Sequence, residues 1–392
     1  MRIFVKGLNS CPMRKQNLEQ YCSFIAASGH RLVNTPQEAD AVLVWTCAFR
    51  GDLRDNSLHE IDRYQNELGV RVIVAGCLPD IDPGLLRSRF KGDIIPWRTD
   101  IQRLKEVFGS DMDPEQFRTV FAEANICNDT MKYRRENPDS DATFHDQFVK
   151  LLVSEGCRFD CSYCSEKLAF PTYRSFQPEE LMESCRRIVA MTGRREVILI
   201  ADSLGEYGCD IGYTLPELIR ILAGAIPGVK LALGNLNPAS FLQYFDEMQE
   251  LLCNGHIRHL NLPLQSASDR ILKLMNRPYT KHDIGRLFGM LNDKCFTEFD
   301  THLIIGFPSE TDADFEETMA FVLQYRPKYI LASNYMESPG MASAKIHPKI
   351  PTETRQLRLR EFERRMKQAG ILCNTDDSEL SADRLRRLNL VK

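Results

Sequence analysis

The sequence predicts an α/β protein in which a small parallel sheet is followed by a partial (β/α)6 barrel. Short apolar runs rich in β-branched residues alternate with helical patterns, and polar residues follow nearly every run. The length of 392 residues allows two or three domains. With 43% hydrophobic and 27% charged residues, the chain is too apolar to be disordered.

The first unit, residues 1–110, is predicted from strands that alternate with helical patterns. The expected strands are residues 2–6, 41–46, 71–75 and a weaker 93–97. Helical patterns at residues 18–27 and 52–68 lie between them, as is typical of parallel strands with helices packed on the sheet. The polar residues 111–147 are expected to form a linker.

The second unit, residues 148–350, contains six further strand–helix repeats, which is short of the eight of a complete barrel. The expected strands are residues 148–153, 196–201, 229–233, 257–262, 299–305 and 328–332. Ligand sites in parallel α/β folds lie at the carboxyl ends of the strands, so the polar residues found there predict a site. Residues 351–392 are charged and helical in pattern, and we expect a helical tail that packs on the barrel.

Composition excludes several classes of protein. No apolar run approaches the roughly 18 residues that a membrane span needs, and the N-terminus is typical of a strand rather than a secretory signal. The net charge of -4 provides no global basic field for a polyanion. Thirteen cysteines in a chain that we expect to be cytoplasmic indicate metal ligands, catalytic thiols or buried packing residues rather than disulfides.

Three cysteines form the most specific motif in the chain. Cys157, Cys161 and Cys164 follow a predicted strand with the spacing Cys-x3-Cys-x2-Cys. Soft thiolate ligands favour iron–sulfur chemistry, and three of them suit three irons of a cubane [4Fe–4S] cluster. The fourth iron would then be open to a substrate-like ligand, whereas a zinc site would normally need a fourth protein ligand or water.

A second trio of cysteines lies in the first unit. Cys11, Cys47 and Cys77 each follow one of its predicted strands. Each alone is typical of a buried cysteine, but parallel strands bring their carboxyl ends together at one edge of a sheet. The three thiols are therefore predicted to share a second cluster.

The first motif resembles the signature of the radical S-adenosylmethionine (SAM) superfamily, Cys-x3-Cys-x-aromatic-Cys. The second trio makes the chain similar to the methylthiotransferases, which carry a cysteine after Asn-Thr and another after Gly where this chain has Thr46-Cys47 and Gly76-Cys77. Further stretches that match the family are Tyr207-Gly208, Leu262 to Ser268, Lys273 to Thr280 and Asp300 to Thr311.

This resemblance implies an N-terminal Rossmann- or flavodoxin-like domain followed by a partial (β/α)6 TIM-barrel radical SAM domain. It implies SAM and two [4Fe–4S] clusters as cofactors, with Cys157, Cys161 and Cys164 as the catalytic ligands of the SAM cluster and Cys11, Cys47 and Cys77 as ligands of an auxiliary cluster. The reduced SAM cluster would cleave SAM to a 5′-deoxyadenosyl radical, with electrons from an external donor such as flavodoxin or ferredoxin. Residues expected to bind SAM are Tyr163, Gln265, Arg277, Ser203 and Glu206.

The activity that the family implies is insertion of sulfur, as methylthio, into an unactivated C–H bond. Its members end in a small RNA-binding β-barrel domain, whereas this chain has only the helical residues 351–392. Together with the acidic net charge, this leads us to expect that tRNA is not the substrate and that a small molecule or peptide is. The chain also departs from the family motifs at residues 165–170 and 334–341.

Two alternatives stay open besides tRNA methylthiolation. The second cluster could serve a rearrangement, a carbon–carbon bond formation or an oxidation without sulfur transfer. A non-catalytic redox sensor is a third reading, against which the SAM-type loops argue. Most remaining cysteines are predicted to be packing residues, and Cys209, expected at the mouth of the barrel, has no assigned role.

Overall fold

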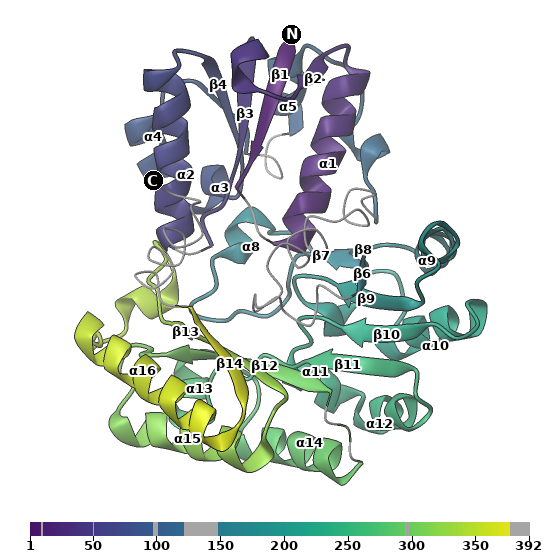
Figure 1. The fold of residues 1–392 in the computed structure, drawn as a ribbon, viewed down its shortest axis with the longest axis vertical. Coiled ribbons are helices and arrows are strands. Elements are labelled where there is room, and N and C mark those ends of the chain that lie inside the picture. The colour runs from purple at the N-terminus through teal and green to yellow at the C-terminus, as the bar shows by residue number, and fades with distance from the viewer. Residues whose placement is uncertain are drawn as a thin grey trace.

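The computed structural model describes residues 1–8, 11–49, 51–96, 101–120, 148–294, 296 and 298–376. Two parallel sheets organise these residues, with the N-terminal sheet above the larger one in Figure 1 and the short helix α8 (Glu166–Ala169) between them. The prediction of a parallel-sheet domain followed by a barrel-like α/β domain is confirmed. Most of the expected linker at residues 111–147, and residues 377–392 of the expected tail, lie outside the described residues.

The N-terminal sheet has the strand order β2-β1-β3-β4-β5, which is the flavodoxin-like order. Its strands are β1 (Arg2–Gly7), β2 (Arg31–Val33), β3 (Ala41–Thr46), β4 (Arg71–Gly76) and β5 (Asp93–Ile94). Its helices are α1 (Pro12–Ala27), α2 (Gly51–Asp62), α3 (Leu78–Ile81), α4 (Pro83–Arg89) and α5 (Ile101–Phe108). Every residue of β3 is buried, so this apolar central strand is covered on both faces.

The second sheet is a parallel, open barrel with the order β14-β13-β12-β11-β10-β9-β6. Its strands are β6 (Val149–Leu152), β9 (Glu196–Ile200), β10 (Lys230–Leu233), β11 (Ile257–Asn261), β12 (Phe299–Ile305), β13 (Tyr329–Asn334) and β14 (Leu372–Asp376). A two-stranded antiparallel ribbon of β7 (Ser154–Glu155) and β8 (Arg174–Ser175) follows β6. The six strands expected from sequence therefore lie side by side in chain order.

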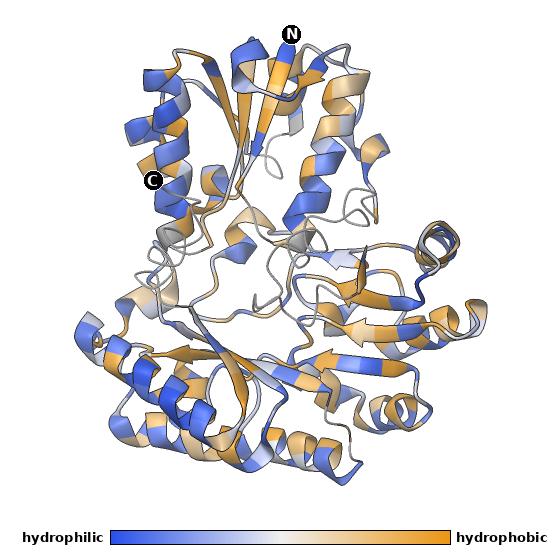
Figure 2. Cartoon of the chain, viewed as in Figure 1, coloured by the Kyte–Doolittle hydropathy of each residue, from blue (hydrophilic) through white to orange (hydrophobic). Residues whose placement is uncertain are grey.

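Helices connect the strands of the barrel and cover its outer side. They are α9 (Pro178–Thr192), α10 (Leu215–Ala225), α11 (Pro238–Gln243), α12 (Phe245–Cys253), α13 (Asp269–Leu274), α14 (Lys281–Asp293), α15 (Asp312–Tyr325) and α16 (Thr352–Ala369). Figure 2 shows the apolar strands inside and the hydrophilic outer face of α16. This amphipathic division places the apolar core between strands and helices.

The C-terminal part of the chain differs from its prediction as a helical tail. Helix α16 accounts for the helical pattern, but β14 follows it and pairs in parallel with β13. The sequence of β14, Leu-Cys-Asn-Thr-Asp, has neither a β-branched run nor a regular alternation of apolar residues. Its pairing with β13, a contact between segments distant in sequence, places this strand, and β14 is then the edge of the sheet.

Asp314 ties the start of α15 to the loop after β11. Its carboxylate accepts hydrogen bonds from the Ser268 hydroxyl at 2.6 Å and the Thr311 backbone N–H at 2.8 Å, and it pairs with Arg270. Burial opposes ionisation of this carboxyl group, but the donated hydrogen bonds together outweigh burial and hold the pKa of Asp314 below its usual range. The ionised form therefore stabilises the fold.

We predict that Asp314→Asn lowers the free energy of unfolding by about 2 kcal/mol at neutral pH, because the ion pair with Arg270 is lost and a neutral amide oxygen is a weaker acceptor in the α15 cap. A lowered folded-state pKa contributes stability that is present above the ordinary pKa of aspartate and is lost as pH falls through the folded value. The difference between wild type and variant should therefore shrink at about pH 3 and below. Urea unfolding across pH tests this, with the exposed Glu317→Gln in the same helix as control. An equal loss of unfolding free energy at neutral pH and at about pH 3 would contradict the prediction.

Candidate functional site

Cys157, Cys161 and Cys164 lie in the loop between the β7 strand and helix α8. Gly156 enters this loop with φ +83°, and a Cβ there would lie 2.5 Å from the Thr172 carbonyl oxygen, so the turn requires glycine. The Gly156 N–H donates to Asp202 Oδ2 at 2.7 Å. The loop is thereby fixed to the carboxyl end of the neighbouring β9 strand.

Other barrel residues fix the middle of the same loop. The Ser162 N–H donates to the Met275 carbonyl at 3.0 Å, and the Ser162 hydroxyl donates to the Leu274 carbonyl at 2.7 Å. The Asn276 side chain donates to the Asp160 carbonyl at 2.6 Å. These bonds hold the thiol-bearing loop against the segment that follows α13.

Cys11, Cys47 and Cys77 each follow one of three neighbouring strands, β1, β3 and β4. Cys11 precedes the first residue of α1, and Cys77 precedes the first residue of α3. Gly76 has φ +93°, and a Cβ there would lie 2.4 Å from the Thr46 carbonyl oxygen. This close approach brings the end of β4, with Cys77, against the end of β3.

Cys47 is held by its own set of hydrogen bonds. Its backbone N–H donates to the Ser57 hydroxyl at 3.0 Å, and that hydroxyl donates to the Cys47 carbonyl at 2.8 Å or the Leu53 carbonyl at 2.9 Å. Ser57 lies on α2, so this helix fixes the position of the cysteine. Cys47 and Cys77 are buried, with exposed fractions of 4% and 6%.

Thiols in both triads have raised pKa values, so they stay protonated unless a cation such as a metal ion binds beside them. Burial raises the pKa of the Cys11 and Cys157 thiols to about 12 and raises that of Cys77 and Cys164 well above the usual value. Thiolates are the ligand form, so each of these groups requires a cation beside it to ionise.

The donor chemistry of the two triads, three thiols each, suits an iron–sulfur cluster. In each triad, the charge of one thiolate acts on the others. Among the described residues, no group of three or more His, Cys, Asp or Glu is gathered tightly enough to hold one metal ion. A cubane binds each cysteine at a different iron, so its ligands stand at separate corners. Both triads fit such a cluster.

Two of the predicted SAM contacts lie directly beside the SAM-type triad. The Arg277 guanidinium donates to Cys161 Sγ at 3.4 Å and to the Pro263 carbonyl at 2.7 Å. Tyr163 packs edge-on against Phe307, with ring centroids 6.3 Å apart. Arg277 therefore contacts the triad directly, and Tyr163 adjoins it in the chain.

The other three predicted contacts lie at strand ends. Gln265 has φ +70°, a left-handed conformation that is uncommon for a residue with a side chain, and its N–H donates to the His302 carbonyl at 2.8 Å. Glu206 accepts from the Arg158 N–H at 2.8 Å, and the Ser203 hydroxyl bonds Cys157. In this structure Ser203 and Glu206 support the cysteine loop, and their contact with SAM stays a prediction.

Cys209 lies outside both triads. Its side chain is exposed, and its thiol contacts the Arg158 side chain. It is thus a neighbour of the SAM-type loop, without a place in either set of thiols.

Arg14 is a central residue that the sequence did not indicate. It lies in the first turn of α1, with an exposed fraction of 1%, and it pairs with Asp202 after β9 and with Glu166 of α8 at 3.5 Å. Burial, the largest influence, and the charge of Asp202 raise the pKa of Glu166 to about 7. Nothing local marks Arg14, because its partners are more than one hundred residues away in sequence.

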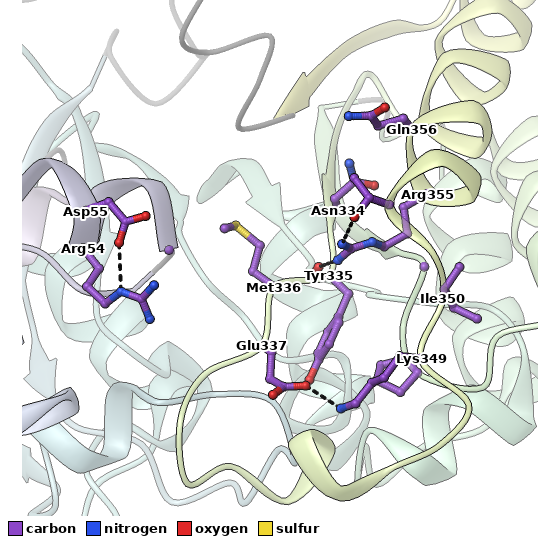
Figure 3. A pocket seen from close by; sticks show the side chains of 14 residues that line it. Arg54, Asp55, Asn334, Tyr335, Met336, Glu337, Lys349, Ile350, Arg355 and Gln356 are labelled. Atoms are coloured by element: carbon purple, nitrogen blue, oxygen red, sulfur yellow. Dashed lines mark hydrogen bonds and ion pairs between the residues drawn. The ribbon is translucent and has the colours of Figure 1, made fainter. Parts of the chain in front are cut away.

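A cavity of about 480 Å³ lies where the two sheets meet (Figure 3). The first turn of α2 contributes Arg54 and Asp55 on one side, and the segment after β13 contributes Met336 and Glu337. Arg355 of α16 lies on the opposite side and donates to the Tyr335 carbonyl at 2.5 Å. Residues that follow strands of both sheets thus line one space, as expected for a ligand site in parallel α/β folds.

Known families match both halves of the chain. Residues 3–95 match the uncharacterized protein family UPF0004, and residues 151–322 match the radical SAM superfamily. A probable threonylcarbamoyladenosine tRNA methylthiotransferase from Pyrococcus horikoshii is 28% identical over 88% of this chain and 79% of its own length. The human threonylcarbamoyladenosine tRNA methylthiotransferase is 28% identical over 90% of this chain and 60% of its own length.

Solved structures share the fold. The radical SAM methyltransferase TsrM from Kitasatospora setae, with cobalamin and a [4Fe–4S] cluster bound, superposes with a TM-score of 0.58 at 14% identity, covering 87% of this chain and 76% of that one. The cobalamin-dependent radical SAM enzyme OxsB, with aqua-cobalamin and SAM bound, gives a TM-score of 0.54 at 11% identity, over 93% of this chain and 56% of that one. At these identities the likeness concerns architecture.

The relatives contradict the expectation that tRNA is not a partner. Those named above are tRNA methylthiotransferases, and their similarity extends over most of this chain. The expectation relied on the net charge of -4, which sums the whole surface. Nucleic-acid binding depends instead on the local field beside the phosphates.

The two family matches, the relatives and the two triads all indicate the same kind of protein. Both domains occur in the order expected, and each brings three cysteines to the junction. SAM and [4Fe–4S] clusters are the cofactors that this combination implies. The chain is a transferase that belongs to the radical SAM methylthiotransferase family.

Proposed function

We propose that this protein methylthiolates tRNA, with a threonylcarbamoyladenosine nucleoside as its target. The observation that carries the proposal is one cysteine triad beyond the strands of each sheet, with Arg14 joining the two regions, in a chain whose relatives are tRNA methylthiotransferases. No relative named above acts on a small molecule or peptide. We place the activity in the cytoplasm, where thiols are kept reduced.

In this proposal, Cys157, Cys161 and Cys164 hold the cluster that binds and cleaves SAM. When bound there, the cluster would supply the electron for the cleavage, and these residues would hold it in position. Arg277 lies beside Cys161, so it can orient a carboxylate near that pocket. Tyr163 and Phe307 form an apolar wall that keeps water from the reacting groups.

Cys11, Cys47 and Cys77 hold the auxiliary cluster, at which sulfur for the product would be bound. Cys47 and Cys77 are buried and Cys11 is half-buried, which limits the access of bulk solvent to this site. Helix α2 positions Cys47 through Ser57, and the same helix contributes Arg54 to the cavity. The auxiliary site and the cavity therefore share one supporting element.

The cavity suits an anionic group of nucleoside size. Its volume of about 480 Å³ is within the range of small-ligand pockets. Arg54, Lys349 and Arg355 line it together with Asp55 and Glu337, which pair with Arg54 and Lys349, so the charged lining keeps an excess of one positive charge. A threonyl substituent carries a carboxylate, and tRNA carries phosphates, so cations at this position favour such a substrate.

The cluster assignment predicts the iron content of variants. Anaerobic reconstitution should yield about eight irons per chain, and Cys47→Ala should reduce this to about four, because one cubane loses a ligand. SAM cleavage to 5′-deoxyadenosine under dithionite should persist in the variant. Cys253→Ala, at an exposed cysteine, is the matched control. Full iron content in Cys47→Ala would remove this residue from the auxiliary site.

The substrate assignment predicts a defined product. The reconstituted protein, incubated with SAM, dithionite, a sulfide source and tRNA that carries threonylcarbamoyladenosine, should replace one C–H hydrogen of that nucleoside with a methylthio group, and Cys47→Ala should not. Mass spectrometry of digested tRNA measures the gain. Unchanged tRNA, with SAM still cleaved, would refute the substrate, and a modified nucleoside without sulfur would indicate a different radical reaction.

A further inference from the structure

We propose that Arg14 is a positioning residue that sets the electrostatic potential at the auxiliary triad and links that triad to the SAM-cluster loop. This inference rests on the assignment of one cluster to each triad. It concerns a residue whose contacts lie between the two sites, and it does not depend on which substrate the protein modifies.

The position of Arg14 relates it to the auxiliary triad. It lies three residues after Cys11, and its backbone N–H faces the Cys11 sulfur. Its charge acts on the thiols of both Cys11 and Cys77. The guanidinium carbon lies 3.1 Å from the ring centroid of Phe170, which belongs to the same apolar cluster as Cys77.

The guanidinium reaches across the junction to the SAM-cluster loop. It pairs with Asp202, whose second oxygen accepts from the Gly156 N–H at 2.7 Å, next to Cys157. It also pairs with Glu166 at 3.5 Å, two residues after Cys164. One side chain thus contacts groups on both sides of the SAM-type cysteines.

A further hydrogen bond fixes the orientation of the guanidinium. Arg14 Nη1 donates to Asn17 Oδ1 at 3.0 Å, and Asn17 in turn donates to Glu155 at 2.8 Å, on the β7 strand that leads into the loop. Within the part of the chain that the structure describes, Arg14 Nε has no hydrogen-bond partner. One donor of a fully buried cation therefore remains for a group bound at the junction.

Burying a charge is costly, so a buried arginine with two carboxylates is weak grounds for a stabilising role alone. The positive charge of Arg14 instead acts on the electrostatic potential at the auxiliary triad. A cluster with thiolate ligands becomes more negative when it takes up an electron, and a nearby positive charge favours that state. Arg14 should therefore raise the reduction potential of the auxiliary cluster, and Asp202 should lower it.

The test is a redox titration of the reconstituted holoenzyme, followed by electron paramagnetic resonance. SAM is added so that the signal of the SAM-binding cluster separates from that of the auxiliary cluster. Arg14→Gln should lower the ratio of reduced to oxidised auxiliary cluster at a fixed potential by about tenfold, equal to about 59 mV for one electron. Arg14→Lys, which keeps the charge, should change it less.

Asp202→Asn should shift the potential in the opposite direction, because it removes a negative charge while its amide oxygen can still accept from Gly156. Shifts of opposite sign in the reduction potentials of Arg14→Gln and Asp202→Asn indicate an electrostatic role. A general loss of structure would not shift the two potentials in opposite directions. Arg2→Gln, in the exposed Arg2–Asp40 pair of the same domain, is the control and should leave the potential unchanged.

An unchanged potential in Arg14→Gln, or shifts of the same sign in Arg14→Gln and Asp202→Asn, would overturn the proposal. If Arg14→Gln fails to take up iron, Asp202→Asn and Arg14→Lys still decide the matter. The readout is independent of tRNA, so a failure of the substrate assignment would leave this result unaffected. A wild-type protein that takes up only about four irons on reconstitution, by contrast, would show that there is no auxiliary cluster for Arg14 to act on.

Discussion

Parallel strand direction is the constraint on which the site depends. Within each sheet the strands run the same way, so their carboxyl ends share one edge. Cysteines that are far apart in sequence, such as Cys11 and Cys77, become neighbours at such an edge. The two edges then meet, because Arg14 beside the first sheet contacts Asp202 beside the second. An antiparallel arrangement would send alternate cysteines to opposite ends.

Much of the architecture could be predicted because its signals are local. The expected strands are apolar runs. In the structure β3 of the first sheet and β9 of the barrel are almost entirely buried, which explains why their residues are apolar. The SAM-type trio was recognisable from its Cys-x3-Cys-x2-Cys spacing, and the second trio because each of its thiols follows a strand. The chemistry of both pockets was thus inferred from short stretches of sequence. Tyr163 and Arg277 were named from family resemblance, and both lie beside Cys161 or its neighbours.

The remaining features depend on contacts between distant segments. Arg14 and Asp202 are 188 residues apart, and neither has a distinctive local pattern. Strand β14 is defined by its pairing with β13 rather than by its own composition. The expectation that tRNA is not a partner failed for a related reason: net charge is a sum over the whole chain, whereas binding of a polyanion depends on local charge.

Helix α16 gives the cavity a wall that is independent of the metal-binding loops. Arg355 extends from this helix over the end of β12, where its aliphatic stem packs against Gly306. The helix comes after all six cysteines of the two triads in the chain and bears none of them. Mutations on its inner face can therefore widen or narrow the opening while both sets of thiols keep their geometry. Related proteins can therefore differ in which ligand the cavity admits while they keep the same radical chemistry.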